Sequence, residues 1–332
     1  MQALEPTLMA VLALVLTCGF WGLSFPVLKA LQLEQALRLP DASSWFLAAW
    51  IQLARFGTAA VLLVPAVLHL PRPTRREIQQ GFELAAWGGL GMGIQTDGLA
   101  YTEASTSAFL TQAYCVLLPL WLVLRSRRVP SRRLIGATAL VVVGTAVLSG
   151  IRPGSLMIGR GELETLLSTL FFTGQILTLE KPRYAENRGR PVTLMMCVGI
   201  AVLALPVAWA TAPTSGAMLT AGASLPTAGM LALLAVFCTI GAFLLMNTYQ
   251  RYVPATEAGL IYTSEPVFAS AYALFLPAWL GAWAGISYPN EQATLTLMCG
   301  GGLILAANVW MQWKGTPHWL PAWLTVGGRR KR

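Results

Sequence analysis

A succession of ten apolar segments constrains this chain more than any other feature of its sequence. The segments cover roughly residues 7–31, 45–69, 82–102, 105–124, 133–150, 161–180, 192–211, 226–250, 255–277 and 294–313. A helix of about 20 mostly apolar residues crosses a hydrocarbon core of about 30 Å, so each segment predicts a membrane-spanning helix. Only 11% of the residues are charged, against about 25% in soluble domains. We expect an all-α polytopic membrane protein with ten transmembrane helices, and we expect the run from Leu8 to be the first of them rather than a cleaved signal.

The distribution of Lys and Arg over the loops predicts the topology. Loops after odd-numbered segments hold only Arg38, Arg152 and Arg160. The other loops and the C-terminal tail hold Arg72, Arg75, Arg76, Arg125, Arg127, Arg128, Arg132, Arg133, Lys181, Arg183, Arg188, Arg190, Arg251, Lys314, Arg329, Arg330, Lys331 and Arg332. Because cytoplasmic loops are enriched in basic residues, both termini are predicted to be cytoplasmic.

Composition also excludes several classes of protein. The net charge of +9 lies in loops between apolar segments, which favours a role in topology over nucleic-acid binding. The five cysteines fall within apolar segments without CxxC spacing, and His69 and His318 lie at segment edges. We therefore expect no metal and no cofactor. The chain has no phosphate-binding glycine loop and no intramembrane histidine, so we do not expect an enzyme.

The two halves of the chain echo one another. Thr106, Ala108 and Leu110 match Thr256, Ala258 and Leu260 at an offset of 150 residues, and residues 20–29 pair with 171–180 at an offset of 151. Because five segments are an odd number, the second half would enter the membrane from the opposite side. Such inverted repeats are typical of secondary carriers, whose site lies near the midplane. We predict a first five-helix repeat at 1–150, a second at 151–313 and a basic cytoplasmic tail at 314–332.

Several sequence motifs of this chain are similar to those of one transporter family. They are FWGLSFPVLKA at 20–30, LARFG at 53–57, IQTDGLAYTEASTSAFLTQAYCVLLPL at 94–120, LIGATALVVVGTAVL at 134–148 and ATEAGLIYTSEPVFASAYAL at 255–274. In order and spacing these motifs resemble those of the ten-helix EamA-type exporters of the drug/metabolite transporter superfamily. The resemblance implies paired five-helix repeats around a central cavity, alternating access, and export of small metabolites or drugs across the bacterial inner membrane.

Two departures from the family pattern involve carboxylates. The family often carries a second glutamate soon after the EPVFA motif, whereas here Glu291 lies far along the following loop. Asp97 stands where an apolar residue is more usual. Because of these departures, the resemblance does not assign any particular substrate of the family to this chain.

Glu265 is the strongest candidate for a functional residue. A carboxylate at bilayer depth costs about 2.5–3.5 kcal/mol, so such residues commonly bind a substrate cation or exchange a proton. The alternative is a packing glutamate bonded to neighbouring helices. Pro266 is expected to kink the span beside it. Other polar or amphipathic side chains within segments suit either a cavity or helix–helix hydrogen bonds: Tyr262, Gln112, Tyr114, Trp21, Gln175, Gln95 and Tyr101.

Four further charges are candidates for gating or structural roles. Arg55 lies inside the second segment and needs a carboxylate or water, and we favour a structural tether over substrate contact. Lys29 and Asp97 could pair as an outer gate, although we favour snorkelling of Lys29 to the membrane surface. Glu180 adjoins Lys181 and Arg183, where an interfacial salt bridge is the simpler explanation.

The leading hypothesis is a secondary exporter of small organic solutes that rocks around a site near Glu265, Tyr262 and Gln112. The alternative is a non-transporting membrane sensor or scaffold of the same fold, with an integral-membrane enzyme as a third option. The expected partners are a small-molecule substrate and the lipid bilayer. Substrate, direction, proton coupling and the choice between monomer and homodimer stay open.

Overall fold

The computed structural model describes residues 4–125, 131–148, 158–179, 181–253, 258 and 261–312. These residues form helices and no strand. The long helices are α1 (Leu4–Arg38), α2 (Ser44–Leu68), α3 (Arg75–Leu99), α5 (Tyr114–Arg125), α6 (Arg132–Leu148), α7 (Arg160–Leu179), α8 (Gly189–Ala210) and α15 (Leu295–Gln312). The shorter ones are α4 (Ala104–Thr111), η1 (Pro182–Tyr184), α9 (Ala217–Thr220), α10 (Leu225–Leu233), the π-helix η2 (Leu234–Gly241), α11 (Ala242–Tyr249), η3 (Gln250–Tyr252), α13 (Glu265–Ala273) and α14 (Leu276–Ala284).

Length and composition make this a multi-pass membrane protein. Among the described residues, four helices are long and apolar enough to cross a bilayer: Leu8–Arg38, Ser44–Leu68, Gly189–Ala210 and Leu225–Tyr252. The α13–α14 pair, bent by 54°, adds a fifth span if it is counted as one. The all-helical class expected from the sequence is therefore confirmed.

Helix α1 continues past the expected end near Leu31 because its polar last turns find partners. The carboxylate of Glu34 accepts hydrogen bonds from Ser224 at 2.7 Å and Thr227 at 2.6 Å, and Gln35 donates to the carbonyl of Ala221 at 3.1 Å. Buried polar groups need such partners. Helix α3 likewise begins before the apolar segment, because Thr74 and Glu77 form a capping box.

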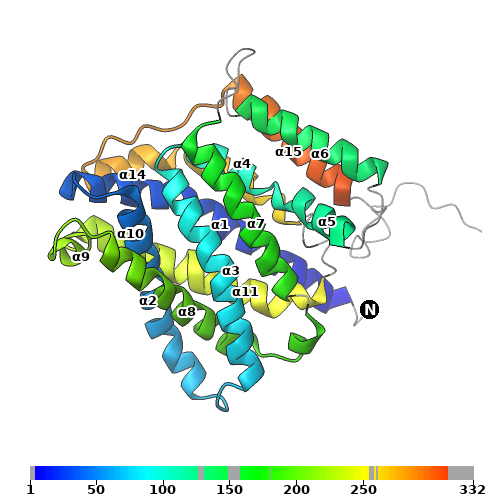
Figure 1. The fold of residues 1–332 in the computed structure, drawn as a ribbon, viewed down its shortest axis with the longest axis horizontal. Coiled ribbons are helices and arrows are strands. Elements are labelled where there is room, and N and C mark those ends of the chain that lie inside the picture. Colours follow the sequence, from blue (N-terminus) through cyan, green and yellow to red (C-terminus); the bar gives the residue numbers. More distant parts are fainter. Residues whose placement is uncertain are drawn as a thin grey trace, which may run out of the picture.

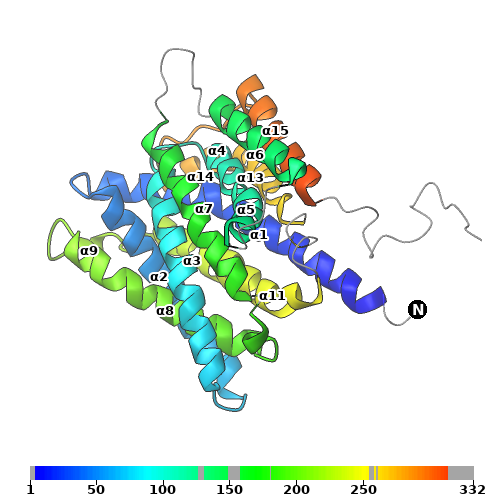
Figure 2. The same ribbon diagram turned by 45° about the vertical axis from the view of Figure 1, so that its right-hand side comes forward.

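The helices pack as pairs that are distant in sequence. Helix α3 lies against α7 and α8, α8 also packs on α2, and α1 contacts α13. Figures 1 and 2 both show α6 and α15 side by side at one edge of the molecule. In that pair the position of a Cβ on Gly144 would lie 2.8 Å from the carbonyl oxygen of Gly300. Small residues thus permit close backbone approach, as in other membrane helix pairs.

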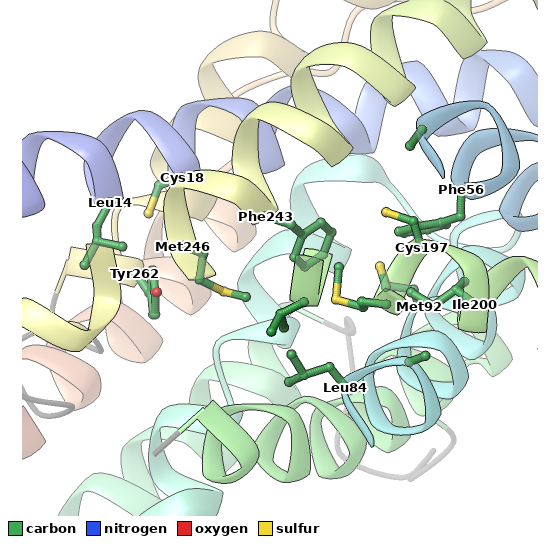
Figure 3. Packing of buried hydrophobic residues seen from close by; sticks show 14 of the residues in the cluster. Leu14, Cys18, Phe56, Leu84, Met92, Cys197, Ile200, Phe243, Met246 and Tyr262 are labelled. Carbon is green, nitrogen blue, oxygen red and sulfur yellow. The ribbon is translucent and has the colours of Figure 1, made fainter. Parts of the chain in front are cut away.

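The largest cluster of buried apolar side chains joins α1, α2, α3, α8 and α11. Figure 3 shows Phe243 and Met246 of α11 between Tyr262 on one side and Met92 on the other. Cys18 and Cys197 pack in the same cluster as small apolar groups. This core surrounds the cavity described below.

Two segments expected to be continuous are interrupted. Helix α4 ends at Thr111 and α5 begins at Tyr114, while the helical residues 261–262 are separated from Glu265 by a turn at 263–264. Pro266 lies in the first turn of α13, where its missing N–H has no intrahelical partner to lose. The expected kink is therefore a full break that precedes the proline.

Candidate functional site

A cavity of about 90 Å³ lies among α1, α2, α3, α7, α11 and α13. Its apolar wall consists of Trp21, Phe25, Leu28, Met92, Phe172, Ile176, Leu179, Phe243 and Met246. Its polar lining consists of Ser24, Arg55, Gln95, Thr96, Thr111, Tyr114, Gln175, Tyr262 and Glu265. A mostly apolar wall with a few convergent polar groups is typical of a site for a small organic ligand.

Glu265 lines this cavity from the first residue of α13, and its side chain is largely buried, at 6% exposure. Gln112, in the break between α4 and α5, donates from Nε2 to Oε2 of Glu265 across 3.4 Å. Gln112 itself is fully buried and does not line the cavity. The two interrupted segments thus meet at the glutamate, which a ligand in the cavity could contact directly.

Aromatic side chains line the wall near Glu265. The ring of Trp21 lies 5.7 Å from that of Tyr262 and 5.5 Å from that of Phe243. The Tyr262 hydroxyl donates to Oε1 of Gln250 at 2.7 Å. Tyr114 is also buried and lines the cavity. Such tilted contacts between rings fix the orientation of this wall.

Arg55 reaches the cavity while it is held by the π-helix η2. Its Nε donates to Oγ1 of Thr239 at 2.6 Å and its Nη2 donates to the carbonyl of Cys238 at 2.9 Å. The guanidinium is 3% exposed, and none of the ion pairs among the described residues involves it. Of the two partners that the sequence left open for Arg55, a carboxylate or water, no described carboxylate pairs with it. A hydroxyl and a carbonyl hold this cation, as the tether interpretation requires.

The remaining predicted cavity residues divide into two groups. Gln95 donates to Thr111 at 2.6 Å, and Gln175 approaches the sulfur of Met196 at 4.0 Å; both line the cavity. Tyr101 does not belong to this group. It is 49% exposed, and its hydroxyl contacts Ser44 and Arg160 on the surface. Its prediction as a cavity residue is wrong, because the hydroxyl lies beyond the end of α3.

Lys29 and Asp97 do not form the gate pair that was considered as the alternative to snorkelling. Asp97, which is fully buried, pairs with Arg160 at 2.5 Å, and Arg160 also bonds to Glu164 at 2.8 Å. Lys29 donates instead to the carbonyl of Thr102, just past the end of α3, and its snorkelling stays a prediction. Sequence proximity gave no indication of the partner Arg160, which lies on a different helix.

At the opposite end of the molecule, a basic cluster surrounds one glutamate on α3. Lys181 pairs with the carboxylate of Glu83, and Arg183 pairs with it at 2.8 Å. Nearby, Arg188 binds Glu77 at 2.7 Å. Glu180, predicted to pair here, lies outside the described residues, as does the tail 314–332. Neither Glu77 nor Glu83 was predicted as a site residue, although both lie in the amino-terminal half of α3, beside basic loops.

A second, larger hollow of about 510 Å³ adjoins the cavity at this end. It is lined by the 181–189 loop and by η3, and Leu179 and Met246 line both spaces. Gln250, the acceptor of Tyr262, lines the hollow. No group of three or more metal-ligating side chains occurs in the described part of the chain.

Comparisons with known proteins are consistent with this architecture. No family model matches the chain. The chain is 29% identical over 271 residues to an “Uncharacterized transporter” of Archaeoglobus fulgidus, covering 80% of this chain and 78% of that protein. A solved structure described only as “Crystal structure of protein” aligns with a TM-score of 0.50 and 15% identity, covering 92% of this chain and 96% of that chain. The chain thus shares its fold with a solved structure and much of its length with a protein named as a transporter.

Proposed function

We propose that this protein is a secondary transporter that exports small organic metabolites or drugs across a bacterial inner membrane by alternating access. The observation that carries the proposal is the buried carboxylate of Glu265, which lines a cavity between two interrupted helical segments. Interrupted helices at mid-membrane commonly form the substrate or ion site of secondary carriers. The similarity to a protein named as a transporter supports the same role.

The proposed architecture has ten membrane spans in two inverted repeats, 1–150 and 151–313, with cytoplasmic termini. The breaks at 112–113 and 263–264 support it, because they fall at matching places in the two segments that echo one another in sequence. Rocking of the halves would alternate access from the two ends. The larger hollow is lined partly by the basic 181–189 loop, so it would open toward the cytoplasm in the proposed topology.

We further propose that the chain acts on its substrate without chemical conversion, as a carrier rather than an enzyme. The competing function is a non-transporting sensor or scaffold. A sensor would need a partner surface, and the basic loop 125–133 and tail 329–332 are its candidates. Residues 126–130 and 313–332 lie outside the described part of the chain.

Reconstitution into liposomes distinguishes these functions. The full chain is reconstituted into liposomes that are loaded with a panel of cationic, zwitterionic, anionic and neutral solutes, and the efflux of each solute is measured. Glu265→Gln should abolish or strongly slow efflux, because the charge is lost while the shape is kept. The matched control is Glu186→Gln, which changes an exposed glutamate in the 181–189 loop. Wild-type efflux by folded Glu265→Gln protein would remove the carboxylate from the mechanism, and retained binding of a cytoplasmic partner without any efflux would favour the sensor.

A further inference from the structure

A separate apolar groove of about 110 Å³ lies where α2, α3 and α8 meet (Figure 1). Four of the side chains that line it are exposed: Trp45, Leu90, Leu203 and Val207. Helices α2 and α8 are both long and apolar enough to cross a bilayer, so the exposed side chains that they contribute face lipid. The groove therefore opens to the hydrocarbon of the membrane rather than to water.

Two glycines of α3 leave room in this groove. Gly89 and Gly93 are four residues apart, so they lie on one face of the helix. A Cβ on Gly89 would lie 3.1 Å from the side chain of Ile200 on α8, whereas a Cβ on Gly93 would meet no atom within 4 Å. The space beside Gly93 is thus open to a ligand.

The groove also holds a buried acceptor without a partner. Gln52 of α2 lines the groove and is 2% exposed, and its Oε1 accepts no hydrogen bond from the described residues. It lies two turns past Ser44, the first residue of α2, which is about 12 Å along the helix and inside the hydrocarbon region. No bulk water reaches that depth. Because Gln52 has the only acceptor among the side chains that line the groove, an ordered water would find too few partners there. The site suits a ligand that brings its own donor.

The same amide group closes the seam between this groove and the central cavity. Nε2 of Gln52 donates to Oγ1 of Thr96 across 3.3 Å, and Thr96 lines the cavity. On α3, Gly93 lines the groove while Met92 lines the cavity. On α2, Gln52 lines the groove while Arg55 lines the cavity. The bond across the seam is longer than the ordinary range of about 2.7–3.2 Å, so a ligand that binds the amide can compete with it.

We infer that the groove is a lateral entry site, at which a small amphipathic solute leaves the lipid and passes between α2 and α3 into the cavity. The solute has an apolar body, which fills the space beside Gly93, and one O–H or N–H, which donates to Oε1 of Gln52. This donor is neutral, because the side chains that line the groove include no counter-ion. Rotation of the Gln52 amide toward the solute releases Thr96 and opens the seam. The inference rests on the proposed function and deepens it by naming a class of solute and its route.

A phospholipid chain is the competing occupant. It would fill the apolar groove equally well, but it has no donor, and its headgroup stays at the membrane surface. Oε1 of Gln52 would then remain unsatisfied. The two occupants differ in one respect that can be measured: only the amphipathic solute binds more weakly when the Gln52 oxygen is removed.

Tryptophan fluorescence of the full chain in lipid nanodiscs measures entry without any transport. The probes are 4-bromophenol and 4-bromoanisole, in which a methyl ether replaces the O–H donor. Bromine quenches indole fluorescence only at short range, so Trp45 reports on the groove and Trp21 reports on the cavity. Subtracting the signals of Trp45→Phe and Trp21→Phe from that of the wild type isolates each reporter. 4-Bromophenol should quench both reporters and saturate, at lower concentrations than 4-bromoanisole.

Three variants make the test decisive. Gln52→Leu removes the acceptor, so it should weaken 4-bromophenol binding at Trp45 by roughly 2- to 12-fold, as expected for one hydrogen bond, and leave 4-bromoanisole binding unchanged. Gly93→Leu fills the groove, so it should abolish saturable quenching of Trp45 and slow the quenching of Trp21. The matched control is Gly57→Leu. A Cβ on Gly57 also meets no atom within 4 Å, and Gly57 lines neither the groove nor the cavity, so this variant should match the wild type.

The outcomes separate the binding site, the route and the proposed function. Equal binding of the two probes, or unchanged 4-bromophenol binding in Gln52→Leu, would mean that the groove holds only a lipid-like chain and would overturn the inference. Unchanged quenching of Trp21 in Gly93→Leu would overturn the route into the cavity. Because quenching needs no transport, failure of every solute to leave liposomes would reject the proposed function while binding and entry stand.

Discussion

The tether between Arg55 and the π-helix η2 can be tested by removing one hydroxyl. Thr239 accepts from Nε of Arg55 at 2.6 Å and donates to the carbonyl of Leu234 at 2.9 Å. Thr239→Val keeps the side-chain shape but leaves a buried guanidinium N–H without its acceptor. Hydrogen bonds to charged groups contribute about 1.5–3 kcal/mol. We expect the unfolding equilibrium constant to rise by about 10- to 150-fold, since each 1.4 kcal/mol is about tenfold.

Reversible unfolding in mixed micelles, titrated with a denaturing detergent and followed by Trp fluorescence, measures this change. The matched control is Thr173→Val. Thr173 is also buried, but among the described residues its hydroxyl bonds only to the carbonyl of Thr169 within α7, at 2.8 Å. Without a charged partner, its loss should cost about 0.5–1.5 kcal/mol. If Thr239→Val destabilised the protein no more than Thr173→Val does, the Arg55 tether would contribute nothing to stability.

Three further predictions address the surface, the helix packing and the cavity. Hydrogen bonds from its arginine partner lower the pKa of Glu77 from 4.5 to about 2, so this ion pair should stabilise the fold above pH 4.5 and lose that effect as pH falls toward 2. Glu77→Gln should cost about 2 kcal/mol at pH 7 after allowance for the exposure of the arginine, with a flatter acid limb in pH-dependent unfolding. Gly144→Ala should loosen α15 and speed its proteolysis, because the new methyl would meet a backbone carbonyl at 2.8 Å, whereas Gly302→Ala, with no atom within 4 Å, should not. Tyr262→Phe should lower efflux by about the tenfold expected for one buried hydrogen bond, and Tyr101→Phe should leave efflux unchanged; equal effects would contradict the assignment of the cavity wall.

Six of the eight side chains predicted to line a cavity do line it, but most of its apolar wall was not predicted. Trp21, Gln175 and Tyr262 are amphipathic or polar side chains inside apolar segments, and a site for an organic solute needs such groups. Tyr101 has the same chemistry but lies just past the end of α3, where it meets Arg160 on the surface. A shift of a few residues at a helix end thus separates a cavity residue from a surface residue, and hydropathy does not resolve helix ends that finely.

The partners of the buried charges were not predictable. A Lys29–Asp97 pair was only an alternative to snorkelling, and a carboxylate only one of two partners considered for Arg55, whereas the structure pairs Asp97 with Arg160 and holds Arg55 on η2. These pairings depend on the rotation of each helix about its axis and on which helices become neighbours. Neither property has a local signature in the sequence.

The sequence by itself determined that this is an all-helical, multi-pass membrane protein. Hydrophobicity over about 20 consecutive residues decides whether a segment can lie in lipid, and that property is local. Only the tertiary structure decided that Glu265 meets Gln112 at two helix breaks, and that Glu291 reaches across the molecule to Ala104. Contacts between residues so far apart in the chain depend on how all the helices pack together, so the sequence alone could not determine the chemistry of the cavity.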